Sequence, residues 1–322
     1  MKTVALILTV ALLAAGAAVG PAAARQGAAG TAHTQEADER PLVVNADLVT
    51  VTVTVTDGDG RHVAGLGKGA FAVTDDKVTQ EVSFFAEDDA PASVAVLFDV
   101  SGSMSDDKIE RAREALAGLI RTSHPMDEFF LIGFAADAQL LLDRTRDAEA
   151  VLAKFTYARP RGQTALYDAV YLGVEKVMRG AHRKRAVVVI SDGEDNSSRH
   201  SLGELRRQLQ ESGVAVYAVG VSMNWLPRHG AGEATLRRLA ETTGGRAFFP
   251  DGAAGVSEAF ERIALELRHQ YSIGYRPSNF AADGRWRRVR VKVTPPPGVK
   301  RLRVRAKEGY YAVPRPPGTR HE

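Results

Sequence analysis

The chain has no cysteine among its 322 residues, which excludes disulfide bonds, thiol catalysis, a cysteine-based zinc site and a lipid anchor on cysteine. Several enzyme signatures are also missing. There is no Gly-x-Ser-x-Gly nucleophile elbow, no His-Glu-x-x-His pair and no phosphate-binding loop. The 8 histidines are scattered, and no two of them stand at the spacing of metal ligands. These absences argue against an enzyme.

Long hydrophobic runs are also absent, except for one at the N-terminus. Lys2 precedes an apolar stretch over 4–19, and small residues ending at Ala24 follow it. This pattern predicts a secretory signal peptide over residues 1–24, cleaved after Ala24. The alternative is a retained membrane anchor, although the stretch is shorter than the roughly 20 residues of a spanning helix. The protein is therefore expected to be secreted, or to lie in the periplasm or cell envelope, and the Ala- and Arg-rich composition suggests a bacterial source.

Acidic residues are scarce in the C-terminal segment. Residues 268–322 hold 14 Lys and Arg against 3 Asp and Glu, a net charge of +11. The whole chain carries +3, so residues 1–267 carry −8. A basic face could contact nucleic acid, anionic lipid or an acidic glycan, but secretion and the lack of interleaved aromatic residues argue against nucleic acid. The alternative is that these side chains are solvated or pair with the acidic remainder.

The middle of the chain, residues 92–267, alternates short apolar runs with helical patterns. The predicted strands are Val94–Phe98, Phe129–Phe134, Gln139–Leu142, Ala186–Ile190, Val214–Val219 and Ala247–Phe249. The predicted helices are Asp107–Arg121, Ala148–Lys154, Ala165–Met178, Leu202–Ser212, Ala234–Thr243 and Val256–Leu267. Strands alternating with helices predict an α/β fold with a doubly wound, mostly parallel, six-stranded sheet.

Polar residues follow the first of these strands at once. Asp99, Ser101 and Ser103 come directly after a buried run of Val, Leu and Phe. In open α/β sheets ligands bind at the carboxyl ends of the strands, and three hard oxygen donors suit a cation such as Mg²⁺. One carboxylate and two hydroxyls would not complete a site, so more oxygens must come from elsewhere. Thr164, ahead of a helical pattern, and Asp192, after another buried strand, are candidates.

This set resembles the metal-ion-dependent adhesion site of the von Willebrand factor type A (vWA) domain. The family pattern is Asp-x-Ser-x-Ser, then a distant Thr, then a distant Asp after a later strand. All positions match, and the resemblance covers roughly residues 92–267. It implies that the metal ligands, directly or through water, are Asp99, Ser101, Ser103, Thr164 and Asp192. It also implies a Rossmann-like fold whose strand over 139–142 is an antiparallel edge. Asp195 is expected to be a rim or capping residue.

Strand patterns return on both sides of this domain. Residues 48–56 alternate Val and Thr, which predicts a half-buried strand with Val inside and Thr outside. In the C-terminal segment, Arg288–Val293 and Leu302–Lys307 predict a basic β-hairpin around the turn at 295–298. Each flank is too small to fold alone. We therefore expect residues 41–90 and 268–322 to form one β-sandwich-like unit, with residues 25–40 as a disordered linker; this layout resembles bacterial secreted vWA-related proteins.

The resulting hypothesis is a secreted binding module for cell adhesion. A divalent ion, Mg²⁺ or alternatively Mn²⁺ or Ca²⁺, held by only two carboxylates retains affinity for a third, offered by a partner protein. A first alternative is a metal-dependent phosphoester hydrolase. A second is an architectural envelope protein that docks on an anionic surface through Arg288, Arg290 and Arg303. The sequence does not indicate the oligomeric state.

Overall fold

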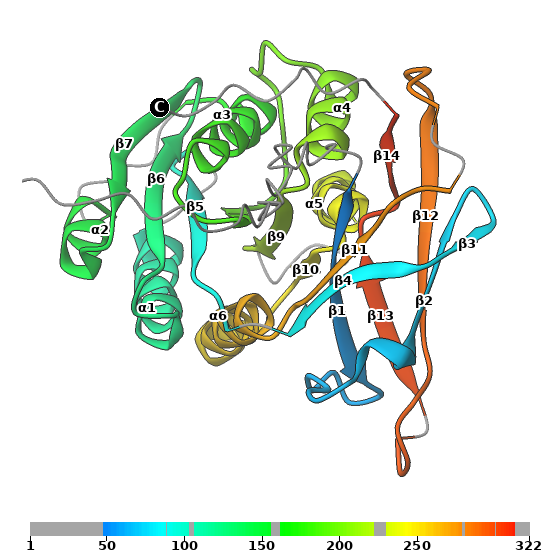
Figure 1. Ribbon diagram of the computed structural model, residues 1–322. Helices are drawn as coiled ribbons and strands as arrows, with labels where there is room; N and C mark the ends of the chain where they lie inside the picture. The colour runs from blue at the N-terminus through cyan, green and yellow to red at the C-terminus, as the bar shows by residue number, and fades with distance from the viewer. Residues whose placement is uncertain are drawn as a thin grey trace, which may run out of the picture. The chain divides into compact units, whose positions relative to one another are not determined.

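The computed structural model describes residues 48–87, 89–102, 106–155, 162–221, 230–278, 281–299 and 301–312. Its central sheet has the strand order β10-β9-β8-β5-β6-β7 (Figure 1). These strands are β5 (Ala92–Asp99), β6 (Glu128–Phe134), β7 (Ala138–Thr145), β8 (Lys184–Ser191), β9 (Ala215–Gly220) and β10 (Arg246–Phe248). All pairs are parallel except β6 with β7, which is antiparallel and lies at the edge. The predicted fold class, including its edge strand, is confirmed.

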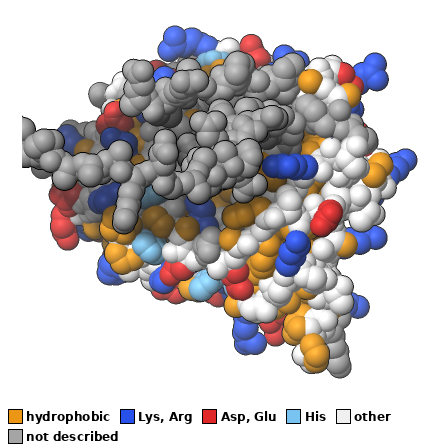
Figure 2. Space-filling model, in the orientation of Figure 1, with side chains coloured by type: hydrophobic (Ala, Val, Ile, Leu, Met, Phe, Trp, Pro, Cys, Tyr) orange, Lys and Arg blue, Asp and Glu red, His pale blue; other side chains and the backbone are white. Residues whose placement is uncertain are grey.

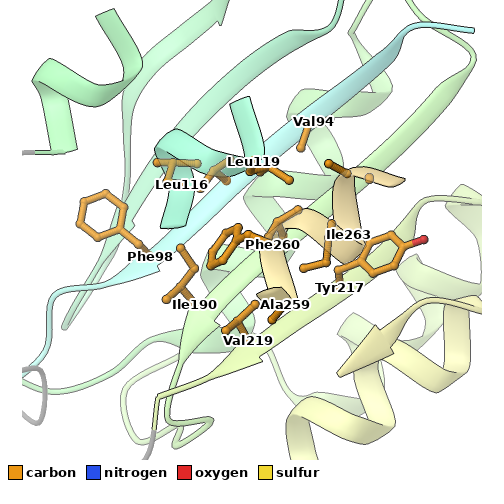
Figure 3. Close-up of a cluster of buried hydrophobic side chains, with 14 of the residues drawn as sticks. Val94, Phe98, Leu116, Leu119, Ile190, Tyr217, Val219, Ala259, Phe260 and Ile263 are labelled. Carbon is orange, nitrogen blue, oxygen red and sulfur yellow. The ribbon is translucent and has the colours of Figure 1, made fainter. Parts of the chain in front are cut away.

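Helices cover both faces of this sheet. One face packs against α1 (Asp106–Thr122), α2 (Ala148–Phe155) and α6 (Gly252–Arg268), and the other against α3 (Leu166–Met178), α4 (Leu202–Ser212) and α5 (Ala231–Thr243). Every residue of β5 is buried because neither face of that strand meets water. Figure 3 shows the ring of Phe260 of α6 among side chains of α1 and the sheet. None of the helices in the described ranges is both long and apolar enough to cross a membrane.

The two flanks of the chain combine into a β-sandwich. Its first sheet has the order β13-β1-β11-β4, and its second has the order β14-β12-β2-β3. The strands are β1 (Val49–Asp57), β2 (Phe71–Asp75), β3 (Val78–Gln80), β4 (Val82–Glu87), β11 (Tyr271–Tyr275), β12 (Trp286–Val293), β13 (Leu302–Ala306) and β14 (Gly309–Tyr311). A short helix, η1 (Lys68–Ala70), precedes β2. Strand β1 lies between two C-terminal strands, so the expectation of an accessory unit built from both flanks is confirmed.

The predicted C-terminal hairpin is wrong. Strand β13 pairs with β1, with Val304 opposite Val55, whereas β12 pairs with β2 in the other sheet, with Val291 opposite Val73. Both strands direct apolar side chains into the shared core. Alternation of polar and apolar residues is the same for two strands in facing sheets and for two strands paired in one hairpin, so it could not distinguish them. The prolines between them lack N–H donors, so this stretch suits a crossing between sheets better than a paired ladder. Strands β3 and β14, of three residues each, were not predicted.

The alternation in β1 was interpreted only partly correctly. Val51, Val53 and Val55 are fully buried in the sandwich core, as predicted, but Thr54 and Thr56 are only 2% and 3% exposed. The threonine face is therefore only partly outside: Thr50 is exposed and Thr52 half-buried, whereas Thr54 is covered by the α/β domain. The Thr54 side chain hydrogen-bonds with that of Tyr217 of β9, a fully buried tyrosine.

Further contacts join the sandwich to the α/β domain. The Arg305 guanidinium lies 2.6 Å from Oε1 of Glu266, and its Nη1 donates to the Gly245 carbonyl at 3.3 Å. Gln270 Nε2 donates to the Tyr217 hydroxyl at 3.1 Å. A Cβ at Gly244 would overlap the backbone of Ala306, so the two parts approach closely there. These contacts make β13 and α6 neighbours across the junction.

A buried carboxylate ties the two sheets of the sandwich together. Asp75, at the end of β2, is 1% exposed, and its Oδ2 accepts hydrogen bonds from the hydroxyls of Tyr275 at 3.0 Å and Tyr310 at 2.8 Å. The next two residues, Asp76 and Lys77, have φ of 44° and 71° and form the two-residue turn into β3. The sequence did not indicate the buried role of Asp75.

Several basic side chains of the C-terminal segment meet acidic partners. Arg268 pairs with Asp89 at 2.6 Å, and Arg287 pairs with Asp283 at 2.8 Å. On the described part of the face shown in Figure 2, Lys and Arg side chains stand apart and do not form one continuous basic area. These pairings show that part of the basic charge is matched within the chain.

The shared sheets predict that residues 48–90 do not fold alone. Without β11 and β13, β1 would lose both neighbours and its valine face would lose most of the core that covers it. Expressed separately, this segment should give the circular dichroism of an unfolded chain and no cooperative melting. A sigmoidal thermal transition in the isolated segment would contradict the shared sandwich.

The structure also predicts a pH dependence centred on His62. Its ring stacks 5.0 Å from that of His269, and both ring nitrogens are buried without a hydrogen-bond partner in the described part of the chain. Burial and the neighbouring His269 lower the pKa of His62 to about 4, although Glu87 opposes the shift. In the unfolded chain His62 therefore binds a proton near pH 6.5, whereas in the folded chain it binds one only near pH 4.

The contribution of His62 to the free energy of unfolding should be at its full value above pH 6.5 and should decrease as the pH drops toward 4. We expect a loss of about 1–2 kcal/mol, discounted because the side chain is only partly buried. Urea unfolding of wild type and His62→Phe at pH 7 and pH 4.5 measures it, with half-buried His182→Phe as the control. An unchanged pH slope in His62→Phe would refute the assignment.

Candidate metal centre

Three loops meet at the carboxyl ends of β5 and β8. The first follows Asp99, the second contains Gly162 and Thr164, and the third begins at Asp192. Asp99 is the last residue of β5, and Asp192 directly follows the last residue of β8. The two strands are parallel neighbours, so both side chains belong to the same edge of the sheet. The first loop is joined to the second by a hydrogen bond from Gly102 N to Gly162 O at 3.2 Å.

The second loop is joined to the third at Thr164. Its N–H donates to Oδ1 of Asn196 at 2.8 Å, and its carbonyl accepts from the N–H groups of Asn196 at 2.9 Å and Ser197 at 3.1 Å. The Thr164 residue is 4% exposed. These bonds fix the position of Thr164 relative to the loop of Asp192. Asn196 was not predicted, because its only signal in the sequence is its place four residues after Asp192.

Asp99 is fully buried, and its carboxylate is held on both oxygens. Oδ1 accepts from Ser101 N at 2.8 Å, and Oδ2 accepts from the Ser191 hydroxyl at 2.7 Å. Burial raises the pKa of the Asp99 carboxyl, hydrogen bonds from Ser101 and Ser191 oppose the shift, and the charge of Asp192 adds to it. Nothing in the sequence indicated Ser191, so its role in orienting Asp99 is a finding of the structure.

The start of α3 is capped from the third loop. The N-cap residue, Ala165, makes no side-chain cap bond. Instead Asp195 Oδ1 accepts from Tyr167 N at 3.1 Å, and the Ser198 hydroxyl accepts from Asp168 N at 3.1 Å. Asp195 is thus a capping residue, which is one of the two roles predicted for it.

Asp168 anchors the end of the third loop to α3. Its Oδ1 accepts from the His200 backbone at 2.9 Å and lies 2.6 Å from Nδ1 of the His200 ring, and Oδ2 accepts from Arg199 N at 3.0 Å. The ring of His200 stacks on Tyr171 at 3.9 Å. Burial would raise the pKa of Asp168, but the hydrogen bonds from Arg199 and His200 outweigh it and lower that pKa.

Two glycines let α5 approach the loop of Asp192. Gly193 has φ of +87°, and a Cβ there would overlap the carbonyl oxygen of Gly232 in the first turn of α5. A Cβ on Gly232 would in turn overlap the Asp192 carbonyl. Only glycine satisfies the backbone angle and the close contact together. The first turn of α5 thereby lies directly against the loop that carries Asp192.

Four of the five predicted ligands lie in these joined loops: Asp99, Ser101, Thr164 and Asp192. The fifth, Ser103, lies outside the described residues. No Lys or Arg in the described part of the chain forms an ion pair with Asp99 or Asp192. The described residues also contain no group of three or more His, Asp or Glu positioned for a metal. Two carboxylates, one of them buried, with hydroxyls beside them are a donor set that fits a hard divalent cation.

The chain belongs to the von Willebrand factor type A domain family, since the family model matches residues 93–262. The matched range contains the six-stranded sheet and all three loops. Domains of this family generally mediate protein–protein contacts, commonly hold a divalent metal at the adhesion site and are typically not enzymes.

Individual relatives match parts of the chain. Inter alpha-trypsin inhibitor, heavy chain 4 of Mus musculus is 32% identical over 130 residues, which is 35% of this chain and 14% of the relative. The magnesium-chelatase 67 kDa subunit of Chlorobaculum tepidum is 27% identical over 175 residues, covering 48% and 27%. This chain thus spans a minor part of these relatives.

A solved von Willebrand factor type A structure from Catenulispora acidiphila is also similar. The alignment covers 84% of this chain and 75% of that one, at 14% identity and a TM-score of 0.48. At this level of similarity no conclusion about function follows from that structure.

The packing of α5 predicts that Gly193→Ala is strongly destabilising. Its Cβ would require a strained positive φ and would overlap Gly232, so the free energy of unfolding should fall by about 2–4 kcal/mol. Gly230→Ala, at the N-cap of the same helix, is the matched control because its Cβ would meet nothing within 4 Å. Denaturant titration compares them, and equal effects would contradict the close contact.

Proposed function

We propose that this protein is a metal-dependent binding module that engages a partner protein through the joined loops. The observation that carries the proposal is the buried Asp99 carboxylate beside Asp192, with no cationic side chain of the described chain pairing with either. Placing a second carboxylate beside one that is buried is unfavourable unless a cation lies between them. Membership in the family supports the same proposal.

The proposed ligands have distinct tasks. Asp99 and Asp192 supply negative charge, while Ser101, Ser103 and Thr164 supply neutral oxygens, directly or through water. Mg²⁺ is the ion we propose, with Mn²⁺ and Ca²⁺ as the alternatives. When bound, the ion supplies a positive centre that only two carboxylates offset, so an acidic side chain of the partner can bind there.

The surrounding residues keep these oxygens in place. Ser191 holds Oδ2 of Asp99, and Asn196 holds the backbone of Thr164. The bonds of Asp168 to Arg199 and His200 limit the movement of the third loop. Oxygens fixed before binding lose little conformational freedom when a ligand arrives, which favours affinity.

We further propose the domain organisation and location predicted by the sequence. Residues 1–24 would be a signal peptide and 25–40 a linker, both outside the described residues. Residues 92–267 would be the binding domain, inserted between the flanks 41–90 and 268–322. The protein would then act outside the cytoplasm, in the envelope or beyond it.

The proposed site predicts a specific response to divalent cations. Saturating Mg²⁺ should raise the melting temperature of the purified protein by about 5–10 °C over EDTA, since an ion that binds only the native state stabilises it by mass action. Mn²⁺ and Ca²⁺, measured in the same way, rank the ions. Differential scanning calorimetry gives the shift.

Asp99→Asn separates a metal role from a structural one. In EDTA the variant should be close to wild type in stability, because removal of a buried charge offsets the lost hydrogen bond from Ser191, yet it should lose the response to Mg²⁺. Asp137→Asn, an exposed carboxylate in the β6–β7 hairpin, is the control and should respond as wild type does. The proposal fails if Asp99→Asn keeps the full shift.

The hydrolase alternative is tested with the same proteins. A phosphoester hydrolase would turn over an aryl phosphate in Mg²⁺ and lose that activity in Asp99→Asn. We propose that no such turnover occurs, and that binding is the function of the site.

A further inference from the structure

A second polar feature lies at the opposite end of the six-stranded sheet from the candidate metal centre. A crevice of about 40 Å³ opens between β1 of the sandwich and the first residues of β8 and β9. Its lining residues are Thr50, Thr52, Thr54, Arg183, Lys184, Arg185, Gly213, Ala215, Thr243, Gly244, Gln270 and Lys307. The amino ends of β8 and β9 form one side of the crevice, and the threonine face of β1 forms the other.

The charge of this lining has one sign. Four of the lining side chains are Lys or Arg and four are Thr, and no Asp or Glu is among the described residues that line the crevice. A cleft with walls of one charge focuses the electrostatic field and concentrates ions of the opposite sign. The composition therefore favours an anionic ligand.

The two arginines are not neutralised by carboxylates of the described chain. Neither Arg183 nor Arg185 forms an ion pair there, and Nε of Arg185 is buried with no hydrogen-bond partner among the described residues. The one polar contact of Arg185 in that part of the chain is from Nη1 to the Met178 sulfur at 3.6 Å. A guanidinium group at least partly removed from water gains from a strong acceptor.

Two carboxylates at this end of the sheet accept hydrogen bonds outside the crevice. Glu128 Oε1 accepts from the Ser93 hydroxyl at 2.7 Å and from Ala181 N at 2.6 Å. Asp127 accepts from the backbone of Ala92 at 2.6 Å and of His124 at 3.0 Å. These bonds hold the strand ends and the preceding loop in place, and neither carboxylate forms an ion pair with Arg183 or Arg185.

We propose that this crevice binds a tetrahedral oxyanion, the phosphate or sulfate group of a small ligand. Guanidinium groups match such an anion with paired, charge-assisted hydrogen bonds, and the hydroxyls of Thr50 and Thr52 add neutral donors. The volume suits one such group and not a ring system, so the remainder of the ligand would lie outside. The ligand would bridge the sandwich and the α/β domain.

This site is independent of the metal centre. The two lie at opposite ends of the parallel strands, and they share no residue. Loss of one should therefore leave the other intact, so that the failure of either proposal is visible separately.

Equilibrium dialysis with radiolabelled inorganic phosphate tests the proposal on the full chain in about 150 mM NaCl, where non-specific surface charge is screened. We expect saturable binding of one phosphate per chain. Arg183→Gln with Arg185→Gln should weaken it by about tenfold or more, because charged hydrogen bonds are lost. Arg206→Gln with Arg207→Gln, two exposed arginines on α4, removes the same charge and should leave binding unchanged.

Competition experiments identify which kind of compound carries the bound phosphate or sulfate group. Displacement by glucose 6-phosphate indicates phosphate esters, displacement by glucose 6-sulfate indicates sulfate esters, and displacement by neither indicates the free ion. If the double variant is unstable, Arg183→Gln alone replaces it, because that side chain is exposed. Absence of saturable binding, or equal weakening in the α4 control, overturns the proposal.

Discussion

A fully buried carboxylate at the end of a fully buried strand constrains the architecture around it. Asp99 loses its water when β5 is covered on both faces, so its oxygens need partners from within the fold. Ser101 and Ser191 provide them, and the packing of three loops places Asp192 close enough to add repulsion. The cation that we propose for this site would offset that repulsion and would couple the stability of this edge of the sheet to metal.

The sandwich allows two flanks to fold together although each is too small to form a core of its own. Neither flank has enough apolar surface to form a core, but together they bury a continuous one between two sheets. Placing β1 between β11 and β13 makes this core depend on residues more than 200 positions apart. The α/β domain is thereby inserted between segments that must meet for the sandwich to form.

The junction connects these two parts through polar side chains. Tyr217 reaches from β9 to Thr54 and Gln270, and Arg305 reaches from β13 to Glu266 at the end of α6. Burial raises the pKa of Tyr217 far above its ordinary value, so its hydroxyl stays protonated and able to donate. Polar groups buried in this way specify one arrangement of the two surfaces, because other arrangements would leave them unpaired.

The amino-acid sequence by itself determined the alternating strands and helices, the edge strand β7 and the loops of Asp99, Thr164 and Asp192. The strands, helices and loops depend on local periodicity and on short motifs at strand ends, whereas the edge position of β7 was implied by the resemblance to the vWA family. The tertiary structure alone decided that β12 and β13 lie in different sheets, that Thr54 and Asp75 are buried, and that Ser191 holds Asp99. Each of these depends on which distant surface covers a residue, and alternation of polar and apolar side chains is the same whichever surface that is.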